Sequence, residues 1–254
     1  MNPFISDSPE SVLWEFLSYP LNTADDILQR FSELPRAIRK KGNGYREEFV
    51  YIPGSRPDAA TLIAHADTVF HFEGKHKMVY ENSIIRSAQE SVGIGADDRA
   101  GCAMAWLLKD VGHNILIFDG EERGQHGSCY LVESQPEILQ EIRNSSFMLE
   151  FDRRTAKAYT AYNCIPVTTE FRNYIESETG YTDHDQRGIT DVCIICSKGC
   201  CGVNVSVSYY NAHSPDEYIV VNEWLHNYDV MLKMLSKPVR RYELRNSLDE
   251  DLPF

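Results

Sequence analysis

The chain has 254 residues, and its 38 Asp and Glu against 25 Lys and Arg give a formal net charge of -13. This acidic balance argues against a nucleic-acid binder, because neutralising phosphates requires a surplus of basic residues. Since 43% of the residues are hydrophobic, the chain can build a packed core, which argues against a disordered or fibrous protein.

The sequence shows no pattern of a membrane-spanning segment, a secretion signal or a disulfide framework. No stretch approaches the roughly 20 apolar residues that span a bilayer, and the first residues lack the pattern of a secretion signal. The seven cysteines do not form two C-x-x-C pairs at the separation of a zinc finger. We therefore expect a cytoplasmic protein with reduced thiols and with neither membrane nor nucleic-acid partners. The oligomeric state stays open, and a monomer is compatible with the sequence.

The predicted elements alternate between helices and short apolar strands. In chain order we expect a helix after Ser8, a helix from Thr23 that ends before 42–44, strands at 48–52 and 61–64, a helix at about 99–109, a strand at 115–118, helices between 127 and 142, a strand at 147–151, a helix at 168–178, strands at 192–195 and 203–209, and a helix at 222–235. This alternation indicates a central sheet covered on both faces. We predict an α/β protein with one domain over residues 1–243 and an acidic tail over residues 244–254.

Histidine and carboxylate side chains follow the predicted strands. His65 and Asp67 come after the strand at 61–64, and backbone alternation puts them on one side, so Asp67 can accept a hydrogen bond from the imidazole. Glu121 and Glu122 come after the strand at 115–118, and like charges this close raise each other's pKa unless a cation neutralises them. Open α/β sheets hold their ligands at the carboxyl ends of their strands.

Three further segments add to this set. Asp97 and its neighbour open a predicted helix, where they also have an ordinary explanation as charges that complement the helix dipole. Asp152 ends the strand at 147–151, with Glu150 two residues earlier on the same side, and His213 follows the strand at 203–209. Nitrogen and oxygen ligands without thiolates suit zinc, manganese or cobalt with open positions for water and substrate.

In order and context, these segments resemble the motifs of a known superfamily. The stretches HAD, GADDRAG, DGEERG, LEFD and NAHSPDE are similar to those of the co-catalytic dinuclear zinc hydrolases, which include the M20, M28 and M42 metallopeptidases. The resemblance extends from about residue 48 to residue 235. It implies a three-layer α/β/α fold with a mixed central sheet and a centre of two Zn²⁺ ions, with Co²⁺ or Mn²⁺ also possible.

The resemblance also implies metal ligands. His65 and Asp152 would bind one metal, Glu122 and His213 would bind the other, and Asp97 would bridge both. Glu150 is the alternative to Asp152 as a ligand.

Other roles are implied for the neighbouring residues. Asp67 would orient the histidine at the first metal, and Glu121 would be the general base. The peptide bond between Asp97 and Asp98 would be cis. Asp191 and the glutamate at 217 would contact the metal ligands without binding a metal themselves.

The resemblance covers the catalytic domain only. M20 enzymes usually carry a lid or dimerisation domain of about a hundred residues before the last metal-binding histidine, and Asp152 and His213 are too close in sequence to hold one.

The activity implied is that of an aminopeptidase or small-peptide peptidase acting on peptide substrates. Two alternatives stay open. One is a deacylase or carboxypeptidase acting on N-acyl amino acids, whose carboxylate could bind arginines beside the motifs: Arg99, Arg123, Arg153 and Arg154. The other is a non-catalytic metal-binding homologue.

Overall fold

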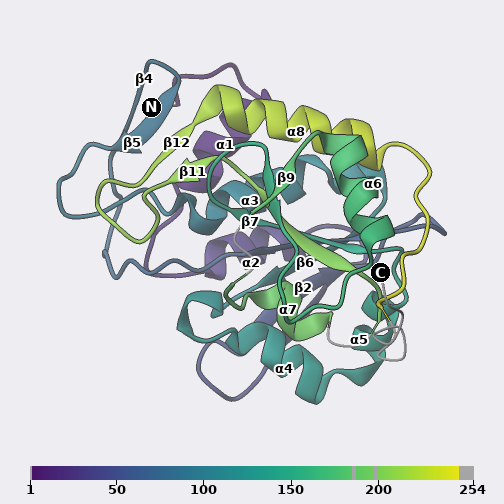
Figure 1. The fold of residues 1–254 in the computed structure, drawn as a ribbon. Helices are drawn as coiled ribbons and strands as arrows, with labels where there is room; N and C mark the ends of the chain where they lie inside the picture. Colours follow the sequence, from purple (N-terminus) through teal and green to yellow (C-terminus); the bar gives the residue numbers. More distant parts are fainter. Residues whose placement is uncertain (1, 185–186, 197–198, 246–254) are drawn as a thin grey trace.

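The computed structural model describes residues 2–184, 187–196 and 199–245 (Figure 1). The helices are α1 (Pro9–Leu17), α2 (Asp25–Ser32), α3 (Ala96–Leu107), α4 (His126–Ser134), α5 (Pro136–Arg143), α6 (Thr169–Thr179), α7 (Asp191–Ile195) and α8 (Val221–Leu235), with 3-10 turns η1 (Lys109–Val111) and η2 (Glu121–Arg123). The strands are β1 (Ile38–Lys41), β2 (Glu48–Ile52), β3 (Thr61–His65), β4 (Met78–Glu81), β5 (Ile84–Ser87), β6 (Asn114–Phe118), β7 (Met148–Arg153), β8 (Ala158–Thr160), β9 (Thr182–Asp183), β10 (Gly202–Ser206), β11 (Tyr209–Tyr210) and β12 (Tyr218–Val220). Within these ranges, no helix has the length and apolar character needed to cross a membrane.

The larger sheet is mixed, and its centre is parallel. Over the described residues its strand order is β1-β2-β6-β3-β7-β10-β8-β9. The four central strands β6, β3, β7 and β10 run parallel, whereas β2 is antiparallel to β6 and β8 is antiparallel to β10. Thr61 lies opposite both Asn114 and Met148, and Met148 lies opposite Gly202. The parallel strands therefore begin at one level, and their carboxyl ends meet at one edge.

Helices cover both faces of this sheet. One layer contains α1, α2, α3, α6 and α8, and the other contains α4, α5 and α7 (Figure 1). Rings at the helix contacts hold the first layer together: Phe16 of α1 and Phe31 of α2 both pack on Trp106 of α3, with ring centroids 6.1 and 5.4 Å away. Strands β2, β3 and β6 are buried along their whole length, as expected between two helical layers. The predicted α/β/α fold with a mixed sheet is confirmed.

Three predicted elements were wrong in type or extent. Residues 192–195 lie in helix α7, which packs on β7 and β10, because a short apolar run fits a buried helix turn as well as a strand. Strand β1 occupies part of the segment assigned to the opening helices and pairs with β2 at the sheet edge. The strand expected at 203–209 divides into β10 and β11, because the chain turns at Ser208, which has a φ of 62°.

A second, smaller sheet was not predicted. It has the strand order β11-β12-β5-β4, and a tight turn at Asn82 and Ser83 joins β4 to β5. The loop between β11 and β12 carries His213 and Glu217, so this sheet positions the last predicted site residues. Between Asp152 and His213 the described chain forms β8, α6, β9, α7 and β10 of the main body. The predicted tail falls mostly on residues 246–254, which lie outside the described residues.

Candidate metal centre

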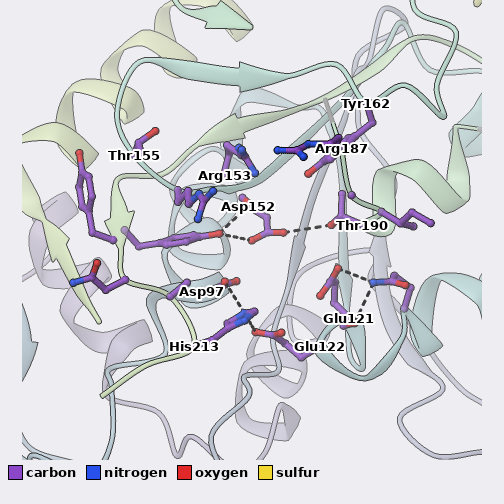
Figure 2. Close-up of a pocket in the computed structure, with 18 of the residues that line it drawn as sticks. Asp97, Glu121, Glu122, Asp152, Arg153, Thr155, Tyr162, Arg187, Thr190 and His213 are labelled. Atoms are coloured by element: carbon purple, nitrogen blue, oxygen red, sulfur yellow. Dashed lines mark hydrogen bonds and ion pairs between the residues drawn. The ribbon is translucent and has the colours of Figure 1, made fainter. Parts of the chain in front are cut away.

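The predicted site residues meet at the carboxyl edge of the parallel strands, and five of them line a pocket of about 810 Å³ (Figure 2): Asp97, Glu121, Glu122, Asp152 and His213. His65 is the last residue of β3, Asp152 lies near the end of β7, and the 3-10 turn η2 after β6 carries Glu121 and Glu122. Asp97 comes from the start of α3 and His213 from the loop after β11. Strands far apart in sequence thus deliver their polar ends to one place, as the sheet topology requires.

Asp97 lies between two histidines. Its Oδ1 is 3.3 Å from Nε2 of His65, and its Oδ2 is 3.1 Å from Nε2 of His213. The same His65 nitrogen lies 3.7 Å from Oδ1 of Asp152, and the same His213 nitrogen lies 3.0 Å from Oε1 of Glu122. Two clusters of ligand-type atoms therefore share one carboxylate.

If the two clusters bind metals, some of their buried ligand atoms should lack hydrogen bonds within the protein, and this is what the structure shows. His65 is only 1% exposed, and among the described residues neither of its ring nitrogens has a well-directed hydrogen bond. Oε1 of Glu122 also lacks a hydrogen bond. Nε2 of His213 lies 3.0 Å away, but it is poorly directed toward this oxygen. Leaving buried polar atoms unpaired costs free energy that a cation would offset. The donor set of imidazole nitrogens and carboxylate oxygens fits zinc, cobalt or manganese.

The crowding of carboxylates shifts the pKa of each group. The nearby carboxylates of Asp97 and Glu122 raise the pKa of His213 to about 11. Burial opposes a charge on His65, yet the carboxylates of Asp152, Asp67 and Asp97 raise its pKa well above the usual value. Burial and the charge of Asp97 raise the pKa of Asp152 to about 7. The site thus concentrates negative charge that protons or cations must balance.

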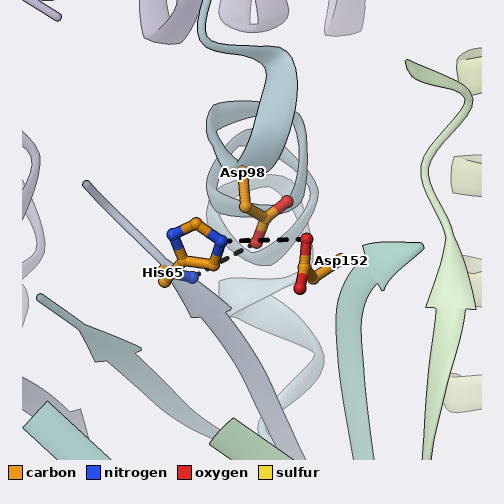
Figure 3. Close-up of side chains that lie close together, drawn as sticks. All are labelled: His65, Asp98 and Asp152. Atoms are coloured by element: carbon orange, nitrogen blue, oxygen red, sulfur yellow. Dashed lines mark hydrogen bonds and ion pairs between the residues drawn. The ribbon is translucent and has the colours of Figure 1, made fainter. Parts of the chain in front are cut away.

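Asp98 lies beside the first cluster but is held by the backbone. His65, Asp98 and Asp152 converge in Figure 3, and their ligand atoms lie within 4.8 Å of one another. Oδ2 of Asp98 accepts the N–H of His65 at 3.2 Å, and Oδ1 accepts the N–H of Gly101 at 2.9 Å. Asp98 therefore ties the end of β3 to the start of α3. The peptide bond between Asp97 and Asp98 is cis, as the resemblance implied.

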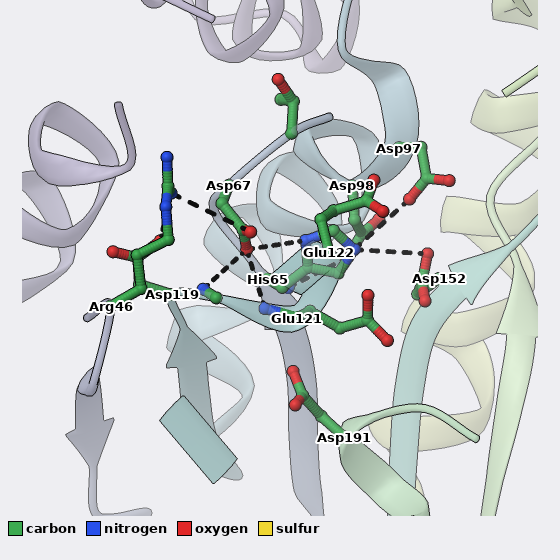
Figure 4. Close-up of polar contacts among 12 residues, drawn as sticks. Arg46, His65, Asp67, Asp97, Asp98, Asp119, Glu121, Glu122, Asp152 and Asp191 are labelled. Atoms are coloured by element: carbon green, nitrogen blue, oxygen red, sulfur yellow. Dashed lines mark hydrogen bonds and ion pairs between the residues drawn. The ribbon is translucent and has the colours of Figure 1, made fainter. Parts of the chain in front are cut away.

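Asp67 joins His65 to the loop that carries the glutamate pair (Figure 4). Its Oδ1 lies 3.3 Å from Nδ1 of His65 and accepts the N–H groups of Gly120 and Glu121 at 2.9 and 3.1 Å. Nη1 of Arg46 lies 3.9 Å from the other oxygen. Asp67 is fully buried, so one carboxylate fixes the relative positions of the histidine and the loop.

Glu121 lines the pocket, and buried carboxylates lie behind it. Its Oε1 accepts a hydrogen bond from Nε2 of Gln125 at 3.0 Å. Asp191 accepts a bond from Ser128 at 2.6 Å, and Glu150 accepts one from Thr190 at 2.9 Å. Burial raises the pKa of both carboxyls well above the usual value. Asp152 lines the pocket, whereas Glu150 lies beneath it.

Several residues that hold the ligands were missed or only partly predicted. The hydroxyl of Tyr209 donates a hydrogen bond to Oδ1 of Asp152 at 3.0 Å. The side-chain amide of Asn204 accepts the backbone N–H of Asp152 and donates to its carbonyl oxygen. Both are more than fifty positions away in sequence, so no local pattern indicates these contacts. Glu217 accepts three backbone N–H groups, including that of Asp97 at 3.1 Å. The NAHSPDE motif, which includes Glu217, was the sequence pattern that indicated a supporting role for this residue.

Only half of the arginines considered for carboxylate binding line the pocket. Arg153 and Arg154 do, and Arg187, which the sequence did not single out, lies with them. Arg99 is fully buried and donates to the carbonyls of Tyr19, Pro20 and Thr23. Arg123 donates to the carbonyl of Val69 and lies 2.7 Å from His71. The expectation for these two arginines was therefore wrong, because both are committed to loop backbone elsewhere.

Comparison with known proteins establishes the fold. No protein-family model and no curated protein matches the chain. Among solved structures, the chain is similar to a tripeptidase of Staphylococcus aureus, with 12% identity, a TM-score of 0.68 and coverage of 90% of this chain and 97% of that one. It is also similar to the aminopeptidase PepT of Bacillus cereus, with 14% identity, a TM-score of 0.63 and coverage of 90% and 98%. The aminopeptidase LapA of Legionella pneumophila gives 16% identity, a TM-score of 0.61 and coverage of 94% and 72%. The chain therefore has the fold of these peptidases.

Proposed function

We propose that this protein is a metal-dependent hydrolase of amide bonds in short peptides or N-acyl amino acids. The observation that carries the proposal is the placement of Asp97, whose two oxygens face His65 and His213 at 3.3 and 3.1 Å. The peptidase fold and the names of the similar aminopeptidases and tripeptidase support the same reaction class.

The ligand assignment follows the two clusters. His65 and Asp152 would hold one zinc ion, Glu122 and His213 would hold the other, and Asp97 would bind both through its separate oxygens. When bound, the metals would supply Lewis acidity that lowers the pKa of water and polarises the substrate carbonyl.

Glu121 would be the general base. It lines the same pocket as the ligands, and the hydrogen bond from Gln125 holds its carboxylate in place. The carboxylate would take a proton from the attacking water as the C–O bond forms at the scissile carbonyl. It would then deliver that proton to the leaving nitrogen as the C–N bond breaks, which balances the hydrolysis.

Asp67 would orient rather than react. It touches His65 and the backbone of the loop after β6, and it is fully buried away from the pocket. Its carboxylate would keep the proton of His65 on Nδ1 and leave Nε2 free for a metal.

The test is a panel of aminoacyl peptides, N-acyl amino acids and dipeptides, assayed with zinc, cobalt or manganese and again after removal of metal by a chelator. We expect hydrolysis of at least one class, loss of activity with the chelator, and recovery on adding metal. Absence of bound metal together with no hydrolysis under any of these conditions would instead favour a non-catalytic homologue.

A further inference from the structure

The small sheet ends in a strand with an open side. Its order is β11-β12-β5-β4, and in the described part of the chain β4 pairs only with β5. In Figure 1 the hairpin of β4 and β5 lies at the upper left margin of the molecule. The outer side of β4 therefore offers backbone N–H and C=O groups to a further strand.

The pairing with β5 determines which backbone groups point outward. Hydrogen-bonded pairs alternate along an antiparallel ladder. The N–H of Ala88 donates to the carbonyl of Lys77 at 2.8 Å, so Lys77 and every second residue after it face β5. Met78 and Tyr80 lie between these positions, and their N–H and C=O groups point away from β5. Within residues 2–184, 187–196 and 199–245, neither residue has a backbone hydrogen bond to another segment.

Strand β4 lacks the features that keep an edge strand unpaired. Charged side chains, proline and bulges usually protect such edges. Strand β1, at one end of the larger sheet, has the basic sequence IRKK, whereas β4 has the sequence MVYE and pairs with β5 without a register shift. Phe4 packs on the ring of Tyr80, with centroids 4.7 Å apart, yet Tyr80 remains 39% exposed. The centre of this edge is therefore apolar and accessible.

The edge is complementary to itself. If two copies of β4 pair antiparallel about a twofold axis at Val79, Met78 of one copy lies opposite Tyr80 of the other, and their outward groups can bond. The same register places Lys77 of each copy opposite Glu81 of the other. Both side chains are exposed, and they would form a pair without backbone bonds, in which side chains approach most closely. Moving the axis by one residue would place a charge opposite Val79 instead.

A contact within the chain leaves Glu81 available. Its Oε2 lies 3.6 Å from Nη2 of Arg86, and both side chains are more than half exposed. Such a long, solvated ion pair contributes little, and the carboxylate keeps room for a second cation.

We propose that β4 binds a second copy of this chain, so that the two small sheets join into one continuous sheet across a twofold axis. Backbone bonds at Met78 and Tyr80 and the two pairs of Lys77 with Glu81 would hold the dimer. The inference does not depend on the proposed hydrolase activity. Because one short strand pair is a small contact, we expect a reversible dimer whose population rises with protein concentration.

Charge reversal tests the register. Lys77→Glu and Glu81→Lys each place like charges opposite one another twice in the dimer, and each should raise its dissociation constant by about tenfold or more. The double variant restores opposite charges and should restore the dimer. Glu137→Lys, at an exposed position of α5, is the control for net charge and should dimerise like wild type. Sedimentation velocity measures the dissociation constants, and circular dichroism establishes that each variant is folded.

Hydrogen exchange locates the contact. Exchange is started at low or at high protein concentration and followed residue by residue by NMR. The amides of Met78 and Tyr80 should exchange more slowly at high concentration, because they are bonded only in the dimer. The amide of Val79 faces β5 and should be protected at both concentrations.

Three results would overturn the inference. One is a wild-type protein that stays monomeric at every concentration. Another is a dimer that neither single reversal weakens, or in which the amides of Met78 and Tyr80 gain no protection, because the contact would then lie on another surface. The third is a double variant that dimerises no better than the single ones, which would contradict the register centred on Val79.

Discussion

Oδ1 of Asp67 lies 3.3 Å from Nδ1 of His65 while accepting two backbone N–H groups from the loop that carries the glutamate pair. One buried carboxylate therefore connects a proposed metal ligand of β3 to the loop after β6. Loss of such a partner typically lowers metal affinity by about 10- to 100-fold.

We expect Asp67→Asn to weaken zinc binding by about this factor, since a neutral amide stabilises the proton on Nδ1 of His65 less than a carboxylate does. Competition with a chromophoric chelator measures the affinity. Asp110→Asn is the control, because that side chain is 85% exposed on the surface. If Asp67→Asn binds zinc as tightly as the control does, Asp67 does not orient His65 for metal binding.

Glu217→Gln should disturb the segment that leads to Asp97. The two oxygens of Glu217 accept the N–H groups of Ile94, Gly95 and Asp97, whereas glutamine has a single acceptor oxygen. We expect a loss of about 1–3 kcal/mol in the free energy of unfolding from the N–H groups left unpaired. Urea unfolding measures the loss, and Glu81→Gln on the surface is the control. Identical unfolding curves would show that the three bonds do not matter.

Gly101→Ala should destabilise the protein although it lies in a helix. A Cβ there would overlap with the carbonyl oxygen of Phe151 and with Oδ1 of Asp98. Replacing a helical glycine by alanine otherwise stabilises by about 1 kcal/mol, whereas overpacking of this kind costs about 1–3 kcal/mol. A stabilised variant in thermal unfolding would contradict the close approach of α3 to β7.

His113 should make folding sensitive to acid. Its Nδ1 accepts the N–H of Ala60 at 3.0 Å and its Nε2 lies 2.9 Å from the carbonyl of Leu235, so the neutral ring satisfies both groups. Burial lowers its pKa in the folded protein below 6.5. The stability from this ring is therefore fully present above pH 6.5 and is lost as the pH falls through the folded pKa.

The difference in unfolding free energy between wild type and His113→Gln should accordingly be largest at pH 7.5 and shrink toward pH 5. Urea unfolding at several pH values measures it, with the exposed His226→Gln as control. A difference that stays constant with pH would contradict this role.

The parts of the fold that sequence could predict are those with strong local patterns. Apolar runs such as 61–64 and 115–118 became buried parallel strands, and the polar residues after them met at one edge. Strand β1 escaped prediction because three of its four residues are Arg and Lys, which suit an exposed sheet edge rather than an apolar run. The run at 192–195 was misassigned because its length and apolarity do not distinguish a strand from a buried helix turn.

The supporting contacts of the site could not be predicted for a different reason. Tyr209 reaches Asp152 across 57 positions, and its contact depends on the turn at Ser208 between β10 and β11. The arginines show the same limit. Arg99 and Arg153 both adjoin motifs, yet only the structure shows that the first is buried against the loop after α1 and that the second lines the pocket.

The central claim is that Glu121 moves protons at a two-metal centre, and Glu121→Gln tests it most directly. The variant is loaded with zinc, its metal content is measured, and its peptide hydrolysis is compared with that of wild type and of the exposed control Glu137→Gln. We predict two zinc ions per chain and a rate lower by roughly 10²- to 10⁴-fold, the contribution of general base catalysis. A metal-loaded Glu121→Gln protein that hydrolyses peptides at the wild-type rate would contradict the account.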